Sequence, residues 1–364
     1  MRSIRLMLVP GLLFAALVNL VEADRQTLSN LFRYTVETDD FGGCATIGED
    51  TLNSIADDAY TLATQGSKAM SDYQDTVANT HEAAKRLVDV MFLKPSDSEF
   101  ETVKGRADGV KTWLESGGNV NNGQNKKKPY LFCGDSWVIR QDMSSQMKDK
   151  DGTDMVDGDG AIIRIKDSSK MVKARKKIAK DWNVKESKIY PYWSAGIGAY
   201  IFNVKYSDDP TKNGCDEADA LGYTMNQGSI SLIVLCPKSF TEVKLHETSV
   251  SAFASSYNEK FGQAPDDNTR IRDVMPAGRT LYHELFHLYW GEDLHPSGKE
   301  EYVFRRMTGN AARRDGTYFV KSQAMSNPEN YAMQAVAYDY TLSVTAGAKD
   351  YPVEFYTGYA TYED

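Results

Sequence analysis

Two of the five histidines in the chain lie four residues apart in the segment Tyr282–Trp290, YHELFHLYW. On a helix, His283 and His287 would lie on one face about one turn apart, so both imidazoles could bind one metal ion. Glu284 would point away from that ion and could take a proton from a water molecule beside it. These residue types at this spacing form the HExxH pattern, which predicts zinc as the metal and hydrolysis as the chemistry.

The flanking residues predict the helix that this pattern needs. Pro276 comes early, where a helix tolerates proline, and Leu281, Leu285 and Leu288 form one apolar stripe. One alternative is an amphipathic helix that carries two histidines without a metal. Another is a zinc site that has lost catalysis, against which the intact Glu284 argues.

The composition of the chain restricts its partners. The 364 residues carry a formal net charge of −9, with 41% hydrophobic residues. A mildly acidic chain argues against nucleic acid and anionic membranes as partners. The basic clusters at Asn125–Pro129 and Lys170–Lys177 are exceptions, which we interpret as solvated surface. Protein or peptide substrates are the expected partners, and the sequence does not indicate an oligomeric state.

The first 23 residues have the layout of a secretory signal peptide. Two arginines precede an apolar run from Leu6 to Val21, and a small residue, Ala23, ends the segment. A membrane anchor is the alternative, but the run is short for a bilayer span and Pro10 interrupts it. We therefore expect a secreted, extracellular protein.

The cysteines fit this expectation. Four cysteines in a secreted chain suggest two disulfides, which have three possible pairings. We favour Cys44–Cys133 and Cys215–Cys236, because the second pair closes a compact loop. A zinc site made of four cysteines is not expected, because no CxxC pair exists.

The pattern along the chain predicts an α+β fold. Apolar residues recur at helical spacing from about residue 50 to 115, and again from about residue 273 onward. Between residues 130 and 237, short β-rich runs alternate with turn residues. We expect a helical N-terminal region at residues 24–128 and a catalytic domain at residues 129–364.

The role of the N-terminal region has two possible interpretations. Residues 115–129, ESGGNVNNGQNKKKP, predict an exposed loop that proteases could nick, so the region could be a propeptide that is removed. It could instead be a permanent helical subdomain that forms one wall of the cleft. A Cys44–Cys133 disulfide would favour the second interpretation.

Three segments together resemble the deuterolysin-like, or aspzincin, metallopeptidases, a family of secreted fungal zinc proteases. They are HELFH, the preceding segment CDEADALGYTMNQGSISLIVLC and the following segment NPENYAMQAVAY. The family has an aromatic-Thr pair in its cysteine-bounded segment, a position held here by Gly222, Tyr223 and Thr224. Its later Asn-x-x-x-Tyr-Ala segment is matched by Asn327, Tyr331 and Ala332. The resemblance covers the chain from Cys215 to Tyr338.

The sequence departs from the family at the third zinc ligand. Aspzincins take it from a Gly-Thr-x-Asp-x-x-Tyr-Gly segment, which this chain lacks. Asp293 is the first choice, because it lies six residues after His287 and follows Gly291, which can end the helix and turn the chain back. The remaining candidates are Asp315, His295 and Glu329.

A zinc peptidase also benefits from a hydrogen-bond donor for the developing oxyanion. We nominate Tyr331, with Tyr302 and Tyr318 as alternatives.

Taken with the motif, the resemblance implies a secreted zinc-dependent metalloendopeptidase with a zincin-like α+β fold and one Zn²⁺ per chain. His283, His287 and Asp293 would bind the zinc, Glu284 would be the general base, and the substrates would be extracellular proteins. The alternative is a secreted protein of the same fold that binds or sequesters zinc without catalysis.

Overall fold

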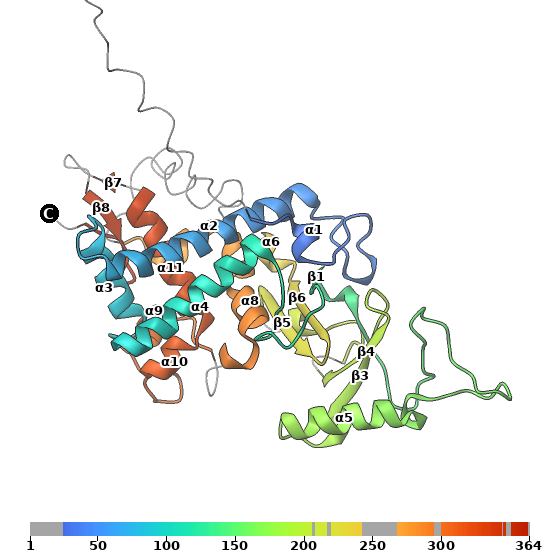
Figure 1. Ribbon diagram of the computed structural model, residues 1–364. Helices are drawn as coiled ribbons and strands as arrows, with labels where there is room; N and C mark the ends of the chain where they lie inside the picture. Colours follow the sequence, from blue (N-terminus) through green and yellow to red (C-terminus); the bar gives the residue numbers. More distant parts are fainter. Residues whose placement is uncertain are drawn as a thin grey trace, which may run out of the picture.

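The computed structural model describes residues 25–205, 208–216, 220–241, 268–294, 300–343, 345–346 and 351–362. The predicted signal peptide lies outside these residues. Most helices gather on one side of the molecule together with the C-terminal strands, and the strands between residues 130 and 235 lie in the middle and on the other side (Figure 1). This mixture of helices and sheets confirms the predicted α+β class.

Three long helices follow one another in the N-terminal region, as the apolar spacing predicted. They are α2 (Glu49–Gln74), α3 (His81–Met91) and α4 (Asp97–Ser116). Helix α4 begins at a capping box, in which Ser96 and Glu99 bind each other's backbone N–H groups. Helix α2 packs against α3, α4 and two later helices, α8 (Gly278–Trp290) and α11 (Pro328–Ser343).

Most of the remaining elements are short. The helices are α1 (Leu28–Leu31), α5 (Ser169–Asp181), α6 (Lys238–Thr241), α9 (Phe304–Met307) and α10 (Lys321–Met325). The strands are β1 (Tyr130–Cys133), β2 (Ile139–Arg140), β3 (Ile189–Ser194), β4 (Ala199–Val204), β5 (Gly222–Gln227), β6 (Ile230–Leu235), β7 (Thr345–Ala346), β8 (Tyr351–Glu354) and β9 (Thr361–Tyr362).

The sheet beside α8 has the order β1-β6-β5, with β1 parallel and β5 antiparallel to the central strand β6. Side chains alternate between the two faces of a strand. Ile233 and Leu235 of β6 therefore join the core formed with the helices, and Leu232 and Val234 join a second cluster around Trp137. Because both faces of β6 are covered, its sequence is almost continuously apolar.

A second sheet, β2-β3-β4, lies farther from α8 and carries the basic helix α5 on its outer side (Figure 1). Both predicted disulfides are present. Cys44–Cys133 joins the N-terminal region to the end of β1, and Cys215–Cys236 links the segment before β5 to the end of β6.

One hydrophobic core spans the predicted boundary at residue 128. It contains side chains from α2, α3 and α4 together with side chains from α8 and α11. Removal of residues 24–128 would therefore expose the buried face of α8. Among the helices of the described residues, none combines the length and apolar character that crossing a bilayer requires.

Glycines allow α8 to lie very close to its neighbours. A Cβ atom at Gly278, where α8 begins, would lie 2.2 Å from Asp58 Cβ and 2.7 Å from the backbone N of Ala59, both on α2. At the other end of α8, a Cβ at Gly109 of α4 would lie 2.8 Å from the Trp290 ring. These two contacts fix how α8 lies against α2 and α4.

We expect Gly278→Ala to destabilise the protein by about 1–3 kcal/mol, the usual cost of overpacking, because the new methyl group would meet α2 backbone. Gly105→Ala is the matched control, since a Cβ there has no neighbour within 4 Å and alanine favours the helix. Urea unfolding of both variants measures the difference. Equal stabilities would contradict the packing described here.

Candidate metal centre

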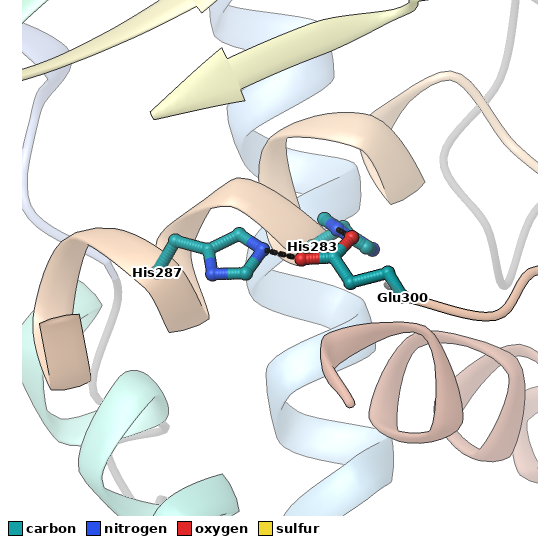
Figure 2. A group of neighbouring side chains, drawn as sticks. All are labelled: His283, His287 and Glu300. Carbon is teal, nitrogen blue, oxygen red and sulfur yellow. Dashed lines mark ion pairs between the residues drawn. The ribbon is translucent and has the colours of Figure 1, made fainter. Parts of the chain in front are cut away.

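Three buried or partly buried side chains converge on one point. The ligand atoms of His283, His287 and Glu300 all lie within 4.8 Å of one another (Figure 2). Nε2 of His287 lies 2.7 Å from Oε1 of Glu300, and Nε2 of His283 lies 3.3 Å from Oε2 of the same carboxylate. A metal ion that binds each atom at about 2 Å needs ligand atoms this close together. Two imidazoles and one carboxylate could therefore hold a metal ion.

Helix α8 supplies the two histidines at a spacing of one turn, as the sequence predicted. The exposed fractions of His283, Glu284 and His287 are only 5%, 6% and 7%. Asn226 of β5 fixes the end of this turn, because its Nδ2 donates a hydrogen bond to the His287 carbonyl at 3.0 Å.

A second carboxylate orients His283 from the side away from Glu300. Nδ1 of His283 lies 3.1 Å from Oε2 of Glu329, which is completely buried at the start of α11. The other oxygen of Glu329 pairs with the guanidinium of Arg279. A carboxylate at Nδ1 keeps the proton there and directs Nε2 towards the metal position, as outer partners of metal-binding histidines do.

Glu284 is held at the edge of the site by strand β5. The Thr224 hydroxyl lies 2.8 Å from Oε2 of Glu284 and donates a hydrogen bond to it. Gly222 lets β5 approach α8 this closely, because a Cβ there would lie 3.1 Å from the Thr280 methyl group and 3.3 Å from Glu284 Cγ. The Gly222–Thr224 segment that carried the family resemblance therefore contacts the predicted base.

Asn327 and Tyr302 position Glu300. Nδ2 of the buried Asn327 donates a hydrogen bond to the carbonyl of Glu301 at 2.9 Å. The Tyr302 hydroxyl donates to Glu300, and its ring stacks on His283 with centroids 5.8 Å apart. Asn327 and Glu329, two positions apart, thus hold the segment of Glu300 and the imidazole of His283.

Hydrogen bonds between the histidines and the carboxylates of the site shift their pKa values. Burial disfavours ionised His283, but hydrogen bonds to Glu300 and Glu329 outweigh burial and raise the pKa of His283 to about 10. Burial likewise opposes ionisation of Glu300, yet hydrogen bonds from His283 and His287 hold its pKa well below the ordinary value. The pKa of Glu329 is also lowered, because Arg279 and His283 offset its burial.

The prediction of Asp293 as third ligand needs correction. Asp293 is exposed, and its Oδ2 accepts a hydrogen bond from Asn122 Nδ2 at 2.6 Å. Gly291 does end α8, with a φ of 59°, but the Asp293 carboxylate that follows it contacts Asn122 instead of the histidines. Glu300 takes the position that we expected for Asp293.

The other ligand candidates have different roles or positions. The Asp315 carboxylate is exposed and accepts hydrogen bonds from the backbone N–H and hydroxyl of Thr317. Glu329 lies behind His283 as its outer partner. His295 lies outside the described residues.

The prediction of Tyr331 as the oxyanion donor also needs correction. Its side chain is fully buried between Phe92 and Phe286, and its hydroxyl donates to the Met325 carbonyl at 2.6 Å. Tyr318 is 61% exposed. Tyr302 is the one of the three tyrosines that contacts the site, through Glu300 and His283.

A cavity of about 870 Å³ opens beside His283, Glu284 and Glu300. Its walls come from the start of β5, the first turns of α8 and the segment after Glu300. The chain after Glu300 contributes Glu301, Tyr302, Val303, Arg306, Arg313, Arg314 and Asp315 to its lining. A substrate could therefore reach both Glu284 and the metal position from one side.

Comparisons with protein-family models, with curated proteins and with solved structures found no match for this chain. The deuterolysin-like resemblance therefore stays a prediction.

We expect Glu300→Gln to weaken zinc binding far more than Asp293→Asn. Loss of an outer partner typically costs about 10–100-fold in metal affinity, and loss of a direct ligand should cost at least as much. Asp293→Asn should leave the affinity unchanged, because Asp293 contacts Asn122 instead of the histidines. Competition with a fluorescent zinc chelator measures both. Equal losses would contradict the assignment of Glu300.

Zinc binding should strengthen as pH rises from 6 to 8. The ion would replace the proton on His283 Nε2, and the raised pKa of about 10 keeps that proton bound across this range. In the metal-free protein, this interaction stabilises the fold fully below the unfolded pKa of about 6.5 and is lost as pH rises through about 10.

Calorimetry in buffers of different ionisation enthalpy should count about one proton released per bound ion at pH 7. An affinity that does not change with pH would show that His283 carries no proton for zinc to displace.

Proposed function

We propose that the protein is a secreted zinc-dependent metalloendopeptidase with a zincin-like catalytic domain. The observation that carries this proposal is Glu284, held by Thr224 beside the group formed by His283, His287 and Glu300. Three protein ligands of the His₂Glu type are common at catalytic zinc sites, which leave one coordination position open. A site that only stores zinc needs neither the open position nor Glu284.

When bound, zinc would supply Lewis acidity, which polarises the peptide carbonyl and lowers the pKa of a water molecule. Glu284 accepts a proton from the attacking water and later gives it to the leaving amine. The hydrogen bond from Thr224 holds the Glu284 carboxylate in the wall of the cavity. Glu329 and Arg279 keep His283 in the tautomer that presents Nε2 to the metal.

Tyr302 is our candidate for the oxyanion donor, in place of Tyr331. Its hydroxyl already donates a hydrogen bond at the site, to Glu300, and Tyr302 lines the cavity. A hydroxyl released from Glu300 when the carboxylate binds metal could donate to the developing oxyanion.

Strand β5 supports a peptide as the substrate. Within the described residues β5 pairs only with β6, so its other edge offers backbone donors and acceptors next to the cavity. An extended peptide can add to such an edge as a further strand. The carbonyl of the bond to be cleaved would then lie beside Glu284. Secretion is part of the proposal and is supported by the two disulfides, which persist in oxidising compartments.

Glu284→Gln should bind zinc as tightly as the wild type and lower the rate of casein cleavage by about 10²–10⁴-fold, the usual contribution of a general base. Zinc content by mass spectrometry and cleavage of unfolded casein should be measured side by side. A chelator should abolish the wild-type activity and zinc should restore it.

Two other outcomes would decide against the proposal. If both proteins hold zinc and neither cleaves, a zinc-binding protein without catalysis is the better assignment. If neither holds zinc, His283 and His287 serve only the packing of α8.

A further inference from the structure

The cavity beside Glu284 is rich in arginine. Arg306, Arg313 and Arg314 line the same cavity as Glu284 and Glu300. They come from a short stretch of chain, α9 and the turn after it. This is unusual in a protein whose net charge is −9.

Glu301 is the nearby acid that Arg306 and Arg313 share. Glu301 lies 3.9 Å from both Arg306 and Arg313, which is beyond hydrogen-bond distance. One oxygen of Glu301, Oε1, already accepts the backbone N–H groups of Tyr302 and Val303, at 3.1 and 3.0 Å. The Asp315 carboxylate is likewise engaged by Thr317.

The stretch from Glu301 to Asp315 brings one more arginine than acid to the cavity. Among its described lining residues, three are arginines and two are acids, whereas Arg279 and Glu329 neutralise each other next to the site. Arg314 is exposed and forms no ion pair with any described residue. A guanidinium in this position suits a carboxylate, which it can bind through two parallel hydrogen bonds.

We propose that Arg314, supported by Arg306 and Arg313, binds a carboxylate of the peptide substrate and gives the enzyme a preference for it near the cleaved bond. The inference rests on the proposed peptidase function, since it names the substrates of that same site. The carboxylate can come from an Asp or Glu side chain or from the free C-terminus of a short peptide. An acidic preference cannot come from the protein as a whole, because its net charge repels acidic peptides.

The first test measures binding separately from catalysis. Zinc-loaded Glu284→Gln protein is titrated into dye-labelled peptides of one background sequence with an amidated C-terminus. The peptides carry Glu, Gln or Lys at one position and are otherwise identical. The set is repeated with this position placed at each point along the background sequence. Fluorescence anisotropy should give about threefold to tenfold tighter binding for Glu than for Gln at one register, with Lys weakest.

Arginine variants made in the same protein identify the group responsible. Arg314→Ala should remove the preference for Glu, and Arg314→Glu should reverse it in favour of Lys. Arg305→Ala is the matched control, because Arg305 is a neighbouring exposed arginine that does not line the cavity. The control should keep the preference of the parent protein.

A fourth peptide ends at the preferred position, with Gln as its last residue and a free C-terminal carboxylate. It distinguishes a side-chain carboxylate from a C-terminal one. Tight binding of this peptide alone indicates a C-terminal carboxylate, and tight binding of the amidated Glu peptide indicates a side chain. If all peptides bind alike, or if Arg314→Glu keeps the parent preference, the inference is wrong.

Cleavage by the wild type separates this result from the proposed function. Cleavage of all peptides at equal rates would contradict the carboxylate preference and leave the peptidase proposal intact. Cleavage of none would contradict the peptidase proposal, and the binding titration would still decide whether Arg314 selects a carboxylate.

Discussion

The buried carboxylate of Glu329 is the constraint on which the site depends. It is completely buried and lies between the guanidinium of Arg279 and the imidazole of His283. A buried charge is tolerated only with partners that satisfy it, and loss of one partner costs several kcal/mol because the other charge is then uncompensated. The pairing therefore fixes α8 against α11, and with it the direction in which His283 points.

The surroundings of α8 explain why a helix with two histidines and a glutamate can be buried. On one side β5 supplies Thr224 and Asn226, which bind the Glu284 carboxylate and the His287 carbonyl. On the opposite side, Leu281, Leu285 and Leu288 join the core shared with α2 and α11. The polar groups thus have hydrogen-bond partners, and the apolar stripe supplies the free energy of packing.

Much of this arrangement could be predicted from local sequence signals. Helical spacing and Gly291 predicted α8, which depends on neighbours along the chain. Of three possible cysteine pairings, the one favoured for its compact loop is the one observed. The third ligand could not be predicted in this way. It depends on where the chain goes after Leu294, and the adjacent acids Glu300 and Glu301 differ only in the contacts that Asn327 and Tyr302 impose.

Tyr331 illustrates the same limit. Its place in a segment that resembles a protease family suggested chemistry, but α11 turns it towards Phe92 and Phe286 in the core. The two residues of that segment that matter to the site, Asn327 and Glu329, act through other residues. Such support roles have no fixed spacing that a sequence could reveal.

The Cys44–Cys133 disulfide has a consequence for any cut in the loop before β1. It joins residues 89 positions apart, one on each side of residues 117–129. A nick there would produce two chains that stay covalently linked, with α2 and α4 still covering α8. The cut protein would keep its size under non-reducing conditions and separate into two polypeptides only with a reductant.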